Sequence, residues 1–296
     1  MKKKNERLML QASYASIGMT ILLLVLKWMA FMMTNSVAVL STLFDSLQDL
    51  MTSGINLLAV RHSVIPADKQ HRFGHGKAQA IGGLVQAIVI FMSGLVLIYQ
   101  SCQHWKNHDE INVFSWGMLL LVISIVLTFV LLRFQKYVIA KTDSISIRAD
   151  MAHYTGDIWM NLGVIISLLF SALFKIQWLD ILFGVGVGLY LCKTTYQIAK
   201  TALGMLMDTE MPTQVRQTIK KTALAFPQVV GVSNLKTRLS GSCLFIQMTV
   251  IMDKDLTLYQ AHQIADKIEN QLHTHFSDCE IILHLEPDSK IIPSNK

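Results

Sequence analysis

Residues 38–60 read AVLSTLFDSLQDLMTSGINLLAV, an apolar stretch that contains two aspartates, Asp45 and Asp49. Its length matches a membrane-spanning helix, which needs about 20 apolar residues to cross ~30 Å of hydrocarbon. On an α-helix, side chains at positions i and i+4 share one face. The stretch therefore predicts a transmembrane helix that points two carboxyl groups in one direction.

A second apolar stretch repeats this arrangement. Residues 151–174 read MAHYTGDIWMNLGVIISLLFSALF and carry His153 and Asp157 at the same four-residue spacing. Ionisable side chains inside a membrane span are costly and usually serve a function. Three carboxyl groups and one imidazole that face one another would form a four-coordinate site, so we expect the two helices to meet through these side chains.

The whole chain has the composition of a membrane protein. Apolar residues make up 52% and charged residues 16% of its 296 residues, whereas soluble domains carry about 25% charged residues. Six candidate spans lie near residues 11–33, 38–60, 79–101, 112–134, 151–174 and 179–200. From about residue 208 the pattern becomes mixed and charged. We therefore expect six transmembrane helices in residues 1–207 and a soluble domain in residues 208–296.

Basic residues are distributed unevenly between the predicted loops. They gather at the N-terminus and around the loops after the second and fourth spans: Lys2, Lys3, Lys4, Arg7, Arg61, Lys69, Arg72, Lys77, Arg133, Lys136, Lys141 and Arg148. The positive-inside rule then places both termini in the cytoplasm. This asymmetry accounts for the net charge of +6 and gives no reason to expect a nucleic-acid partner.

The first apolar stretch is too long for a signal-peptide core and lacks an A-x-A cleavage site, so we expect a retained helix.

The soluble part of the chain predicts a small α+β domain. Ser240-Gly241-Ser242 is a plausible hairpin turn between two β-rich segments. The predicted elements are a helix from Pro212 to about Ala225, strands at Val229–Leu239 and Leu244–Met252, a helix at Leu258–His275 and a short strand at Glu280–Leu285. The order αββαβ is typical of a ferredoxin-like domain facing the cytoplasm.

The four intramembrane side chains favour a divalent metal ion. Zn²⁺ prefers a tetrahedron of histidine nitrogen, carboxylate oxygen or thiolate. A set rich in carboxylates suits Zn²⁺, Fe²⁺, Cd²⁺ or Mn²⁺ better than Cu⁺. Because the ligands must be deprotonated, metal and protons compete for one location, which predicts their exchange. The alternative interpretation is a polar cavity, or pairing of the acids with Lys27 or another base.

Two weaker groups of ligand-type residues lie outside the spans. Asp68, His71 and His75 fall within eight residues of the loop after the second span. They predict a second metal site, which a water or a fourth group would complete. The alternative is a solvated basic loop in which the histidines have no such role.

The soluble domain offers a third group, namely His262, His284 and Glu286. His284 and Glu286 are two positions apart on the last predicted strand and therefore share a face. Histidines on the surface of a soluble domain usually bind nothing, and this alternative remains open.

Cysteines and glycines exclude other classes of site. Cys102, Cys192, Cys243 and Cys279 are far apart and form no C-x-x-C, so neither a disulfide framework nor a zinc ribbon is expected. Gly184, Gly186 and Gly188 lie in an apolar stretch and lack the strand–helix context and lysine of a nucleotide-binding loop. Small residues at this spacing predict close helix packing.

With these motifs the chain resembles the cation diffusion facilitator family, especially its bacterial zinc and ferrous-iron efflux members. The resemblance covers nearly the whole chain and is carried by Asp45-Ser-Leu-Gln-Asp49, His71-Arg-Phe-Gly-His75-Gly-Lys77, Arg148-Ala-Asp-Met-Ala-His153-Tyr-Thr-Gly-Asp157 and Ala261-His262. It implies six transmembrane helices, a cytoplasmic ferredoxin-like domain, a homodimer and metal/proton antiport. It assigns Asp45, Asp49, His153 and Asp157 to the transport site and Asp68, His71 and His75 to a loop site. Lys77 and Asp208 match a charge pair that ties the dimer together near the membrane surface.

The resemblance is incomplete in the soluble domain. Close relatives have a two-metal site there, bridged by an acid. His262 and His284 match one half of it, and Glu286 stands where an aspartate is usual. Ser233 and Thr249 occupy the positions of the other half, and neither is a good zinc ligand. We therefore expect one metal or none in this domain.

These observations predict a multi-pass antiporter of the inner membrane that exports Zn²⁺ or Fe²⁺, with Cd²⁺ and Mn²⁺ as further candidates, in exchange for protons; the resemblance implies that it is a homodimer. Its partners are metal ions, protons and membrane lipid, and no organic cofactor is expected. An intramembrane metalloprotease would require H-E-x-x-H, which the chain lacks, so no enzyme activity is expected. A metal-gated channel or a membrane-bound metal sensor remains the alternative function.

Overall fold

The computed structural model of the chain describes residues 2–34, 37–107, 115–174, 178–276 and 278–288, and the account below concerns these residues. The chain divides into two compact units. One, Lys3–Leu203, is helical, and the other contains Gly204–Lys296 and carries a small sheet. Each unit is described by itself.

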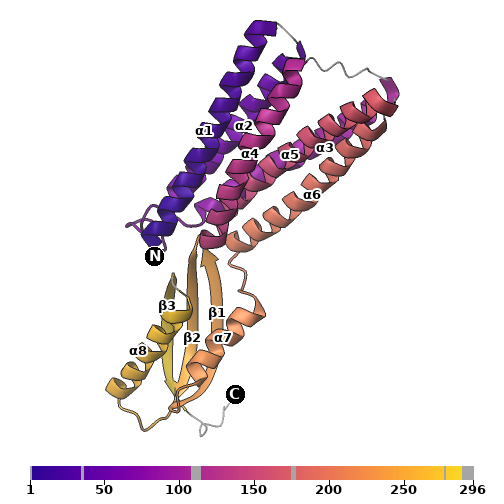
Figure 1. Cartoon of the computed structure of the whole chain (residues 1–296). Helices are drawn as coiled ribbons and strands as arrows, with labels where there is room; N and C mark the ends of the chain where they lie inside the picture. Colours follow the sequence, from indigo (N-terminus) through magenta and orange to yellow (C-terminus); the bar gives the residue numbers. More distant parts are fainter. Residues whose placement is uncertain (1, 35–36, 108–114, 175–177, 277, 289–296) are drawn as a thin grey trace. The chain divides into compact units, whose positions relative to one another are not determined.

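The helical unit consists of long helices, as the apolar stretches predict (Figure 1). They are α1 (Lys2–Thr34), α2 (Val37–Ser63), α3 (Ala78–Asn107), α4 (Ser115–Thr142), α5 (Ile145–Phe174) and α6 (Trp178–Leu206). Among the described residues, three segments are both long and apolar enough to span a membrane: Lys3–Met32, Ala78–Gln103 and Leu121–Thr142. The α-helical membrane architecture is confirmed, while the count of six membrane spans stays a prediction.

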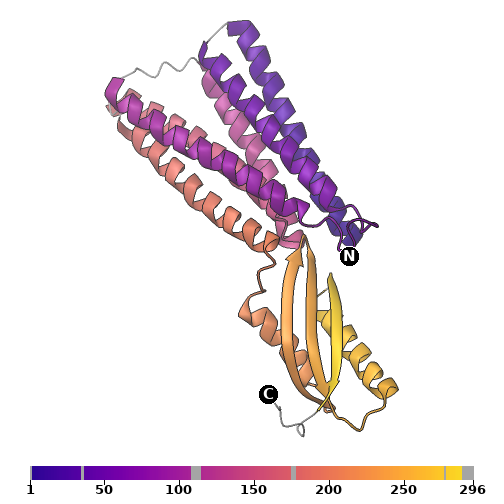
Figure 2. The same cartoon turned by 180° about the vertical axis from the view of Figure 1, so that it is seen from behind.

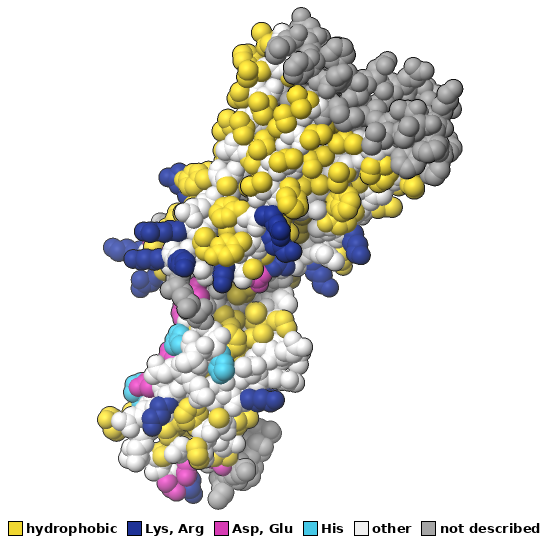
Figure 3. All heavy atoms as spheres, in the orientation of Figure 1, with side chains coloured by type: hydrophobic (Ala, Val, Ile, Leu, Met, Phe, Trp, Pro, Cys, Tyr) yellow, Lys and Arg dark blue, Asp and Glu magenta, His cyan; other side chains and the backbone are white. Residues whose placement is uncertain are grey.

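The helical unit has an inside-out distribution of polarity. Large apolar side chains are exposed along the helices, among them Ile21, Trp28, Met32, Ile88, Phe91, Phe129 and Val130. Figure 3 shows this apolar surface, with lysine and arginine gathered toward one end of the helices. The buried polar residues include Ser16, Thr20, Ser53, Asn56, Gln135 and Asp150, each at most 1% exposed. Such a molecule fits a hydrocarbon environment, where polar groups must find partners inside the protein.

Two of the three glycines of the 184–188 stretch lie at a close helix contact, as predicted. A Cβ atom at Gly188 would lie 2.9 Å from the carbonyl oxygen of Gly94 on α3. A Cβ atom at Gly184 would lie 2.0 Å from Ser101 Oγ on the same helix. No atom lies within 4 Å of a Cβ built at Gly186. Glycine at positions 184 and 188 therefore permits α3 and α6 to approach closely.

The second unit has the predicted αββαβ order. Its elements are α7 (Thr213–Leu224), β1 (Val229–Ser240), β2 (Cys243–Met252), α8 (Leu258–His275) and β3 (Cys279–Pro287). Strands β1 and β2 pair antiparallel around a turn in which Gly241 has φ 62°, and β2 and β3 pair parallel across α8. Thr257 begins α8 with a capping box completed by Gln260.

Both helices of this unit pack on one face of the sheet. Ile219 of α7 and Ile268 and Leu272 of α8 belong to the same core as Ile246 and Met248 of β2, and all five are at most 1% exposed. Figure 2 shows the opposite face of the sheet, with both helices behind the strands. The sheet therefore has a buried inner face and an outer face that α7 and α8 leave uncovered.

Replacement of Leu272 by alanine should destabilise this unit through cavity formation, because the side chain is fully buried in the shared core. We expect the free energy of unfolding to fall by about 2–5 kcal/mol. Urea unfolding followed by circular dichroism of the isolated 208–296 fragment measures it. Leu258→Ala is the matched control, since Leu258 is 83% exposed and should change the free energy by less than about 0.5 kcal/mol. Equal effects of the two substitutions would contradict the described core.

Candidate metal sites

Helices α2 and α5 meet through three of the four predicted intramembrane ligands. His153 Nε2 of α5 lies 2.9 Å from Asp49 Oδ1 of α2 and 3.9 Å from Asp157 Oδ2, one turn further along α5. One ligand atom from each of the three residues lies within 4.8 Å of the others. The fourth predicted ligand, Asp45, belongs to α2, but its side chain lies outside the described residues.

The burial of this group is graded. The His153 side chain is 8% exposed, that of Asp49 is 19% exposed and that of Asp157 is 32% exposed. The carboxylates therefore retain some access from outside while the imidazole is enclosed. A position between three such ligand atoms suits a divalent cation that prefers nitrogen and oxygen ligands.

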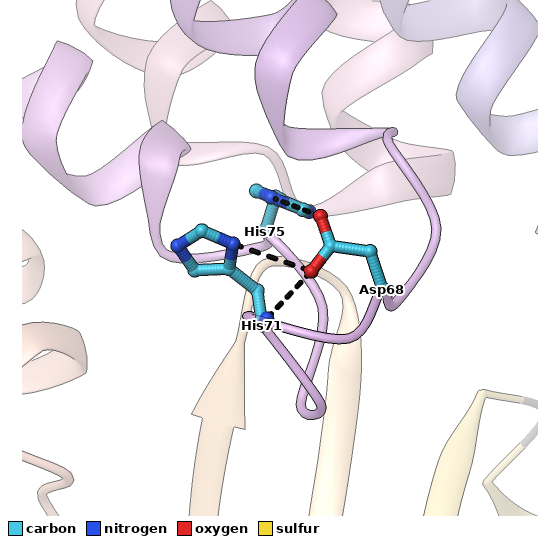
Figure 4. Close-up of side chains that lie close together, drawn as sticks. All are labelled: Asp68, His71 and His75. Carbon is cyan, nitrogen blue, oxygen red and sulfur yellow. Dashed lines mark hydrogen bonds and ion pairs between the residues drawn. The ribbon is translucent and has the colours of Figure 1, made fainter.

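A second group of ligand atoms lies in the loop between α2 and α3 (Figure 4). His71 Nδ1 lies 3.4 Å from Asp68 Oδ1, and His75 Nε2 lies 3.6 Å from Asp68 Oδ2. The two imidazole rings are 4.4 Å apart between centroids. Gly74, at φ 75°, provides the left-handed backbone that turns the chain between the histidines.

The loop backbone holds the Asp68 carboxylate in place. The backbone N–H of His71 donates to Asp68 Oδ1 at 2.6 Å and that of Gln70 at 2.8 Å. The His71 hydrogen bond is the main cause of a lowered Asp68 pKa. This carboxylate is therefore ionised at neutral pH and presents its second oxygen, Oδ2, toward His75.

Sequence comparison now assigns the chain to a family. A family model described as cation efflux transmembrane domain matches residues 13–207, and a second, described as cation efflux protein, cytoplasmic domain, matches residues 211–288. The cation-efflux pump FieF of Klebsiella pneumoniae is 36% identical over 294 residues, which cover 99% of this chain and 97% of that protein. The chain belongs to the cation efflux, or cation diffusion facilitator, family.

Further relatives agree with this assignment. The cation-efflux pump FieF of Citrobacter koseri is 37% identical over 291 residues, which cover 98% of this chain and 97% of that protein. A solved chain titled "Mode of Action of a Putative Zinc Transporter CzrB" is 24% identical, covers 26% of this chain and 98% of that chain, and has a TM-score of 0.26. A TM-score this low has no weight for the fold. The sequence matches make the chain a membrane-spanning cation efflux transporter.

The cytoplasmic domain of this cation efflux transporter brings two of its three predicted ligands together. His284 Nε2 lies 3.4 Å from Glu286 Oε1 on β3. His262 Nε2 lies 3.8 Å from Asp266 Oδ1 on α8 instead. Among the described residues, two groups bring three or more ligand atoms within 4.8 Å of one another, namely the intramembrane group and the loop group. His262, His284 and Glu286 belong to neither of them. Metal binding by His262, His284 and Glu286 therefore stays a prediction.

The sheet register clarifies why this third group is incomplete. Ser233 pairs with Thr249, and Thr249 pairs with His284, so the three residues form one row across the sheet. The hydroxyl group of Thr249 thus belongs to the position next to His284 and that of Ser233 to the position one strand further, where carboxylate or imidazole ligands would be needed for zinc. The register supports the expectation of one metal or none in this domain.

The predicted partner of Asp208 lies in the other compact unit, so the Lys77–Asp208 pair also stays a prediction. Within its own unit, Asp208 Oδ2 accepts a hydrogen bond from Arg238 Nη1 at 3.2 Å. Arg238 in turn lies over the ring of Phe245, at 4.8 Å from the ring centroid. The Asp208 carboxylate therefore has a charged hydrogen-bond partner within its own unit.

A buried polar network, which was not predicted from the sequence, lies beside the predicted intramembrane ligands. Asp150 of α5 is fully buried, and its Oδ2 accepts hydrogen bonds from Ser16 Oγ of α1 at 2.6 Å and from Gln135 Nε2 of α4 at 2.7 Å. Tyr154 of α5 joins hydroxyl groups of α1 and α2 in a similar way. The available signal was the polar stripe Ser13, Ser16 and Thr20, which lies along one face of an otherwise apolar helix.

The Asp68 carboxyl group should titrate below the ordinary aspartate pKa of about 3.9. Because the folded-state pKa is lowered, the ordered loop gains stability above the unfolded-state pKa and loses it as pH falls through the folded-state pKa. Carbon-13 NMR of the Asp68 carboxyl group measures the midpoint. His71→Ala keeps the backbone N–H and should preserve most of the shift. A midpoint at or above the ordinary value in the parent chain would contradict the loop geometry.

Proposed function

We propose that this transporter exports cytoplasmic Zn²⁺ or Fe²⁺ in exchange for protons by alternating access, with Asp45, Asp49, His153 and Asp157 as the transport site. The convergence of Asp49, His153 and Asp157 from two membrane helices supports this proposal above all. Cd²⁺ and Mn²⁺ are further candidate cargoes because they accept the same ligand types. The protein carries ions and changes no covalent bond.

The contact between His153 and Asp49 supports proton exchange at this site. His153 Nε2 and Asp49 Oδ1 are 2.9 Å apart. A proton on His153 Nε2 would therefore lie between two of the atoms that would hold the metal. A cation that binds there must displace this proton, since a histidine ligand is neutral at the bound nitrogen. Metal and proton therefore exclude one another, and alternating access to the two sides of the membrane converts this exclusion into antiport.

The other ligand groups complete the proposal. Asp68, His71 and His75 bind a second divalent ion at the loop, while His262, His284 and Glu286 bind one metal or none. Neither group lies between helices, so both are assigned to regulation or capture rather than to transport. The preformed contacts around Asp68 support the loop site most strongly.

We further propose a homodimer in the inner membrane, with both termini in the cytoplasm. The transport domain comprises residues 1–207 with six membrane spans, and the cytoplasmic domain comprises residues 208–296. Lys77 and Asp208 form the charge pair near the membrane surface. The match to a cytoplasmic domain of cation efflux proteins supports this organisation.

Removal of one intramembrane ligand should abolish transport. In proteoliposomes with an imposed pH gradient, Asp49→Asn and Asp157→Asn should each lower metal uptake at least about 100-fold, since even outer partners of metal ligands cost 10–100-fold. Asp255→Asn is the matched control, because Asp255 is an exposed residue of the cytoplasmic domain and should transport normally. Normal uptake by either ligand variant would refute the site. Uptake that persists without proton counterflow would indicate a channel, and metal binding without uptake would indicate a sensor.

Acidification should weaken metal binding at the transport site. Each proton displaced by the metal raises the apparent Kd by up to about tenfold per unit fall in pH. Titration of the purified chain carrying His71→Ala, His75→Ala, His262→Ala and His284→Ala, which removes the histidine ligands of the loop and of the cytoplasmic domain, isolates the transport site. The slope of log Kd against pH then gives the number of protons displaced, and a slope of zero would exclude proton competition.

A further inference from the structure

We propose that Tyr154 is a positioning residue of the transport site, which it serves through a cluster of three hydroxyl groups formed with Ser53 and Thr20. Tyr154 OH lies 2.7 Å from Ser53 Oγ of α2 and 2.7 Å from Thr20 Oγ1 of α1. Ser53 Oγ and Thr20 Oγ1 are 3.5 Å apart. The inference rests on the proposed function, since it concerns how the transport ligands are held.

The cluster lies on the same helices as the ligands. Tyr154 follows His153 directly on α5, and the two rings are 5.6 Å apart between centroids. Ser53 follows Asp49 by four positions on α2 and therefore lies on the same face one turn away. A slide or rotation of α5 against α2 would break the Tyr154–Ser53 contact and the His153–Asp49 contact together. The hydroxyl cluster thus fixes the register of the two ligand helices.

The chemistry of the cluster suits this role. A hydroxyl group is both donor and acceptor, so three of them satisfy one another without a charge that would compete with the metal. All three side chains are at most 2% exposed, so water offers no alternative partner. Thr20 Oγ1 is also 2.9 Å from the carbonyl oxygen of Ser16, which ties the cluster to the backbone of α1. The ligands are therefore held close together before a metal binds.

A fixed ligand geometry also affects metal choice. Zn²⁺ strongly favours four ligands in a tetrahedron at short distances, whereas selection among divalent ions depends on the geometry that the protein imposes. If α2 and α5 can shift against one another, the Kd for Zn²⁺ should rise more than the Kd for Cd²⁺, because a looser site no longer favours the smaller ion. Tyr154 thereby becomes a determinant of specificity although its hydroxyl group is not a ligand.

The test is calorimetric titration of the purified full-length chain with Zn²⁺ and with Cd²⁺. The parent chain carries His71→Ala, His75→Ala, His262→Ala and His284→Ala so that the ligands of the loop and of the cytoplasmic domain do not contribute. Tyr154→Phe removes one hydroxyl group and keeps the ring in place. We expect the Kd for Zn²⁺ to rise about 10–100-fold, the range found when partners of metal ligands are removed, and the Kd for Cd²⁺ to rise less. Tyr137→Phe is the matched control, because Tyr137 of α4 is 51% exposed and should leave both Kd values unchanged.

Further variants separate positioning from a loss of folding. Ser53→Ala removes the α2 partner alone, and its effect on Zn²⁺ binding should not add to that of Tyr154→Phe, since both break one contact. If Tyr154→Phe lowers the melting temperature, Ser53→Ala alone decides the outcome. Unchanged Kd values and an unchanged Zn²⁺/Cd²⁺ ratio in both variants would overturn the inference. Failure of the parent chain to bind either metal, or unchanged binding by Asp49→Asn, would instead overturn the proposed transport site.

Discussion

The architecture of the helical unit depends on one constraint: a polar side chain surrounded by hydrocarbon must find its partner inside the protein. The buried apolar clusters between these helices are small, such as Ile90, Val187 and Leu191. The lipid-facing surface is apolar, so helix association gains little from the hydrophobic effect. Hydroxyl, amide and carboxyl groups instead provide the specificity of helix packing, because their pairing decides which helix faces meet.

Helix α5 shows how this constraint positions the proposed transport ligands. Asp150 contacts α1 and α4, and Tyr154 contacts α1 and α2. His153 lies between these two anchors in the sequence and contacts Asp49. Oxygens of Asp49 and Asp157 both lie near the imidazole nitrogen Nε2 of His153, so the packing of α5 against α2 gathers three ligand atoms in one place.

Sequence reasoning recovered the features that depend on local periodicity. The apolar stretches, the αββαβ order and the i, i+4 ligand pairs follow from spacing along one element, so the sequence alone predicts them. The polar stripe of α1 indicates buried partners, but the pairing of Ser16 with Asp150 could not be predicted, because the two residues are 134 positions apart and a serine in an apolar helix has many possible partners. For the same reason the contact of Asp208 with Arg238, 30 positions along the chain, was not predicted, while the Lys77–Asp208 pair stays a prediction.

The intramembrane and loop groups differ in how their ligands are held, and this difference separates their proposed roles. The Asp68 carboxylate is held by two backbone N–H groups, and the side chains of Asp68 and His71 are about half exposed, at 49% and 56%. An ion bound there would meet water on several sides and would exchange readily. The intramembrane ligands belong to helices that buried hydroxyl groups join, and the His153 side chain is 8% exposed. An ion bound to His153 would therefore be more enclosed than an ion in the loop, and this enclosure separates the proposed transport site from a surface site.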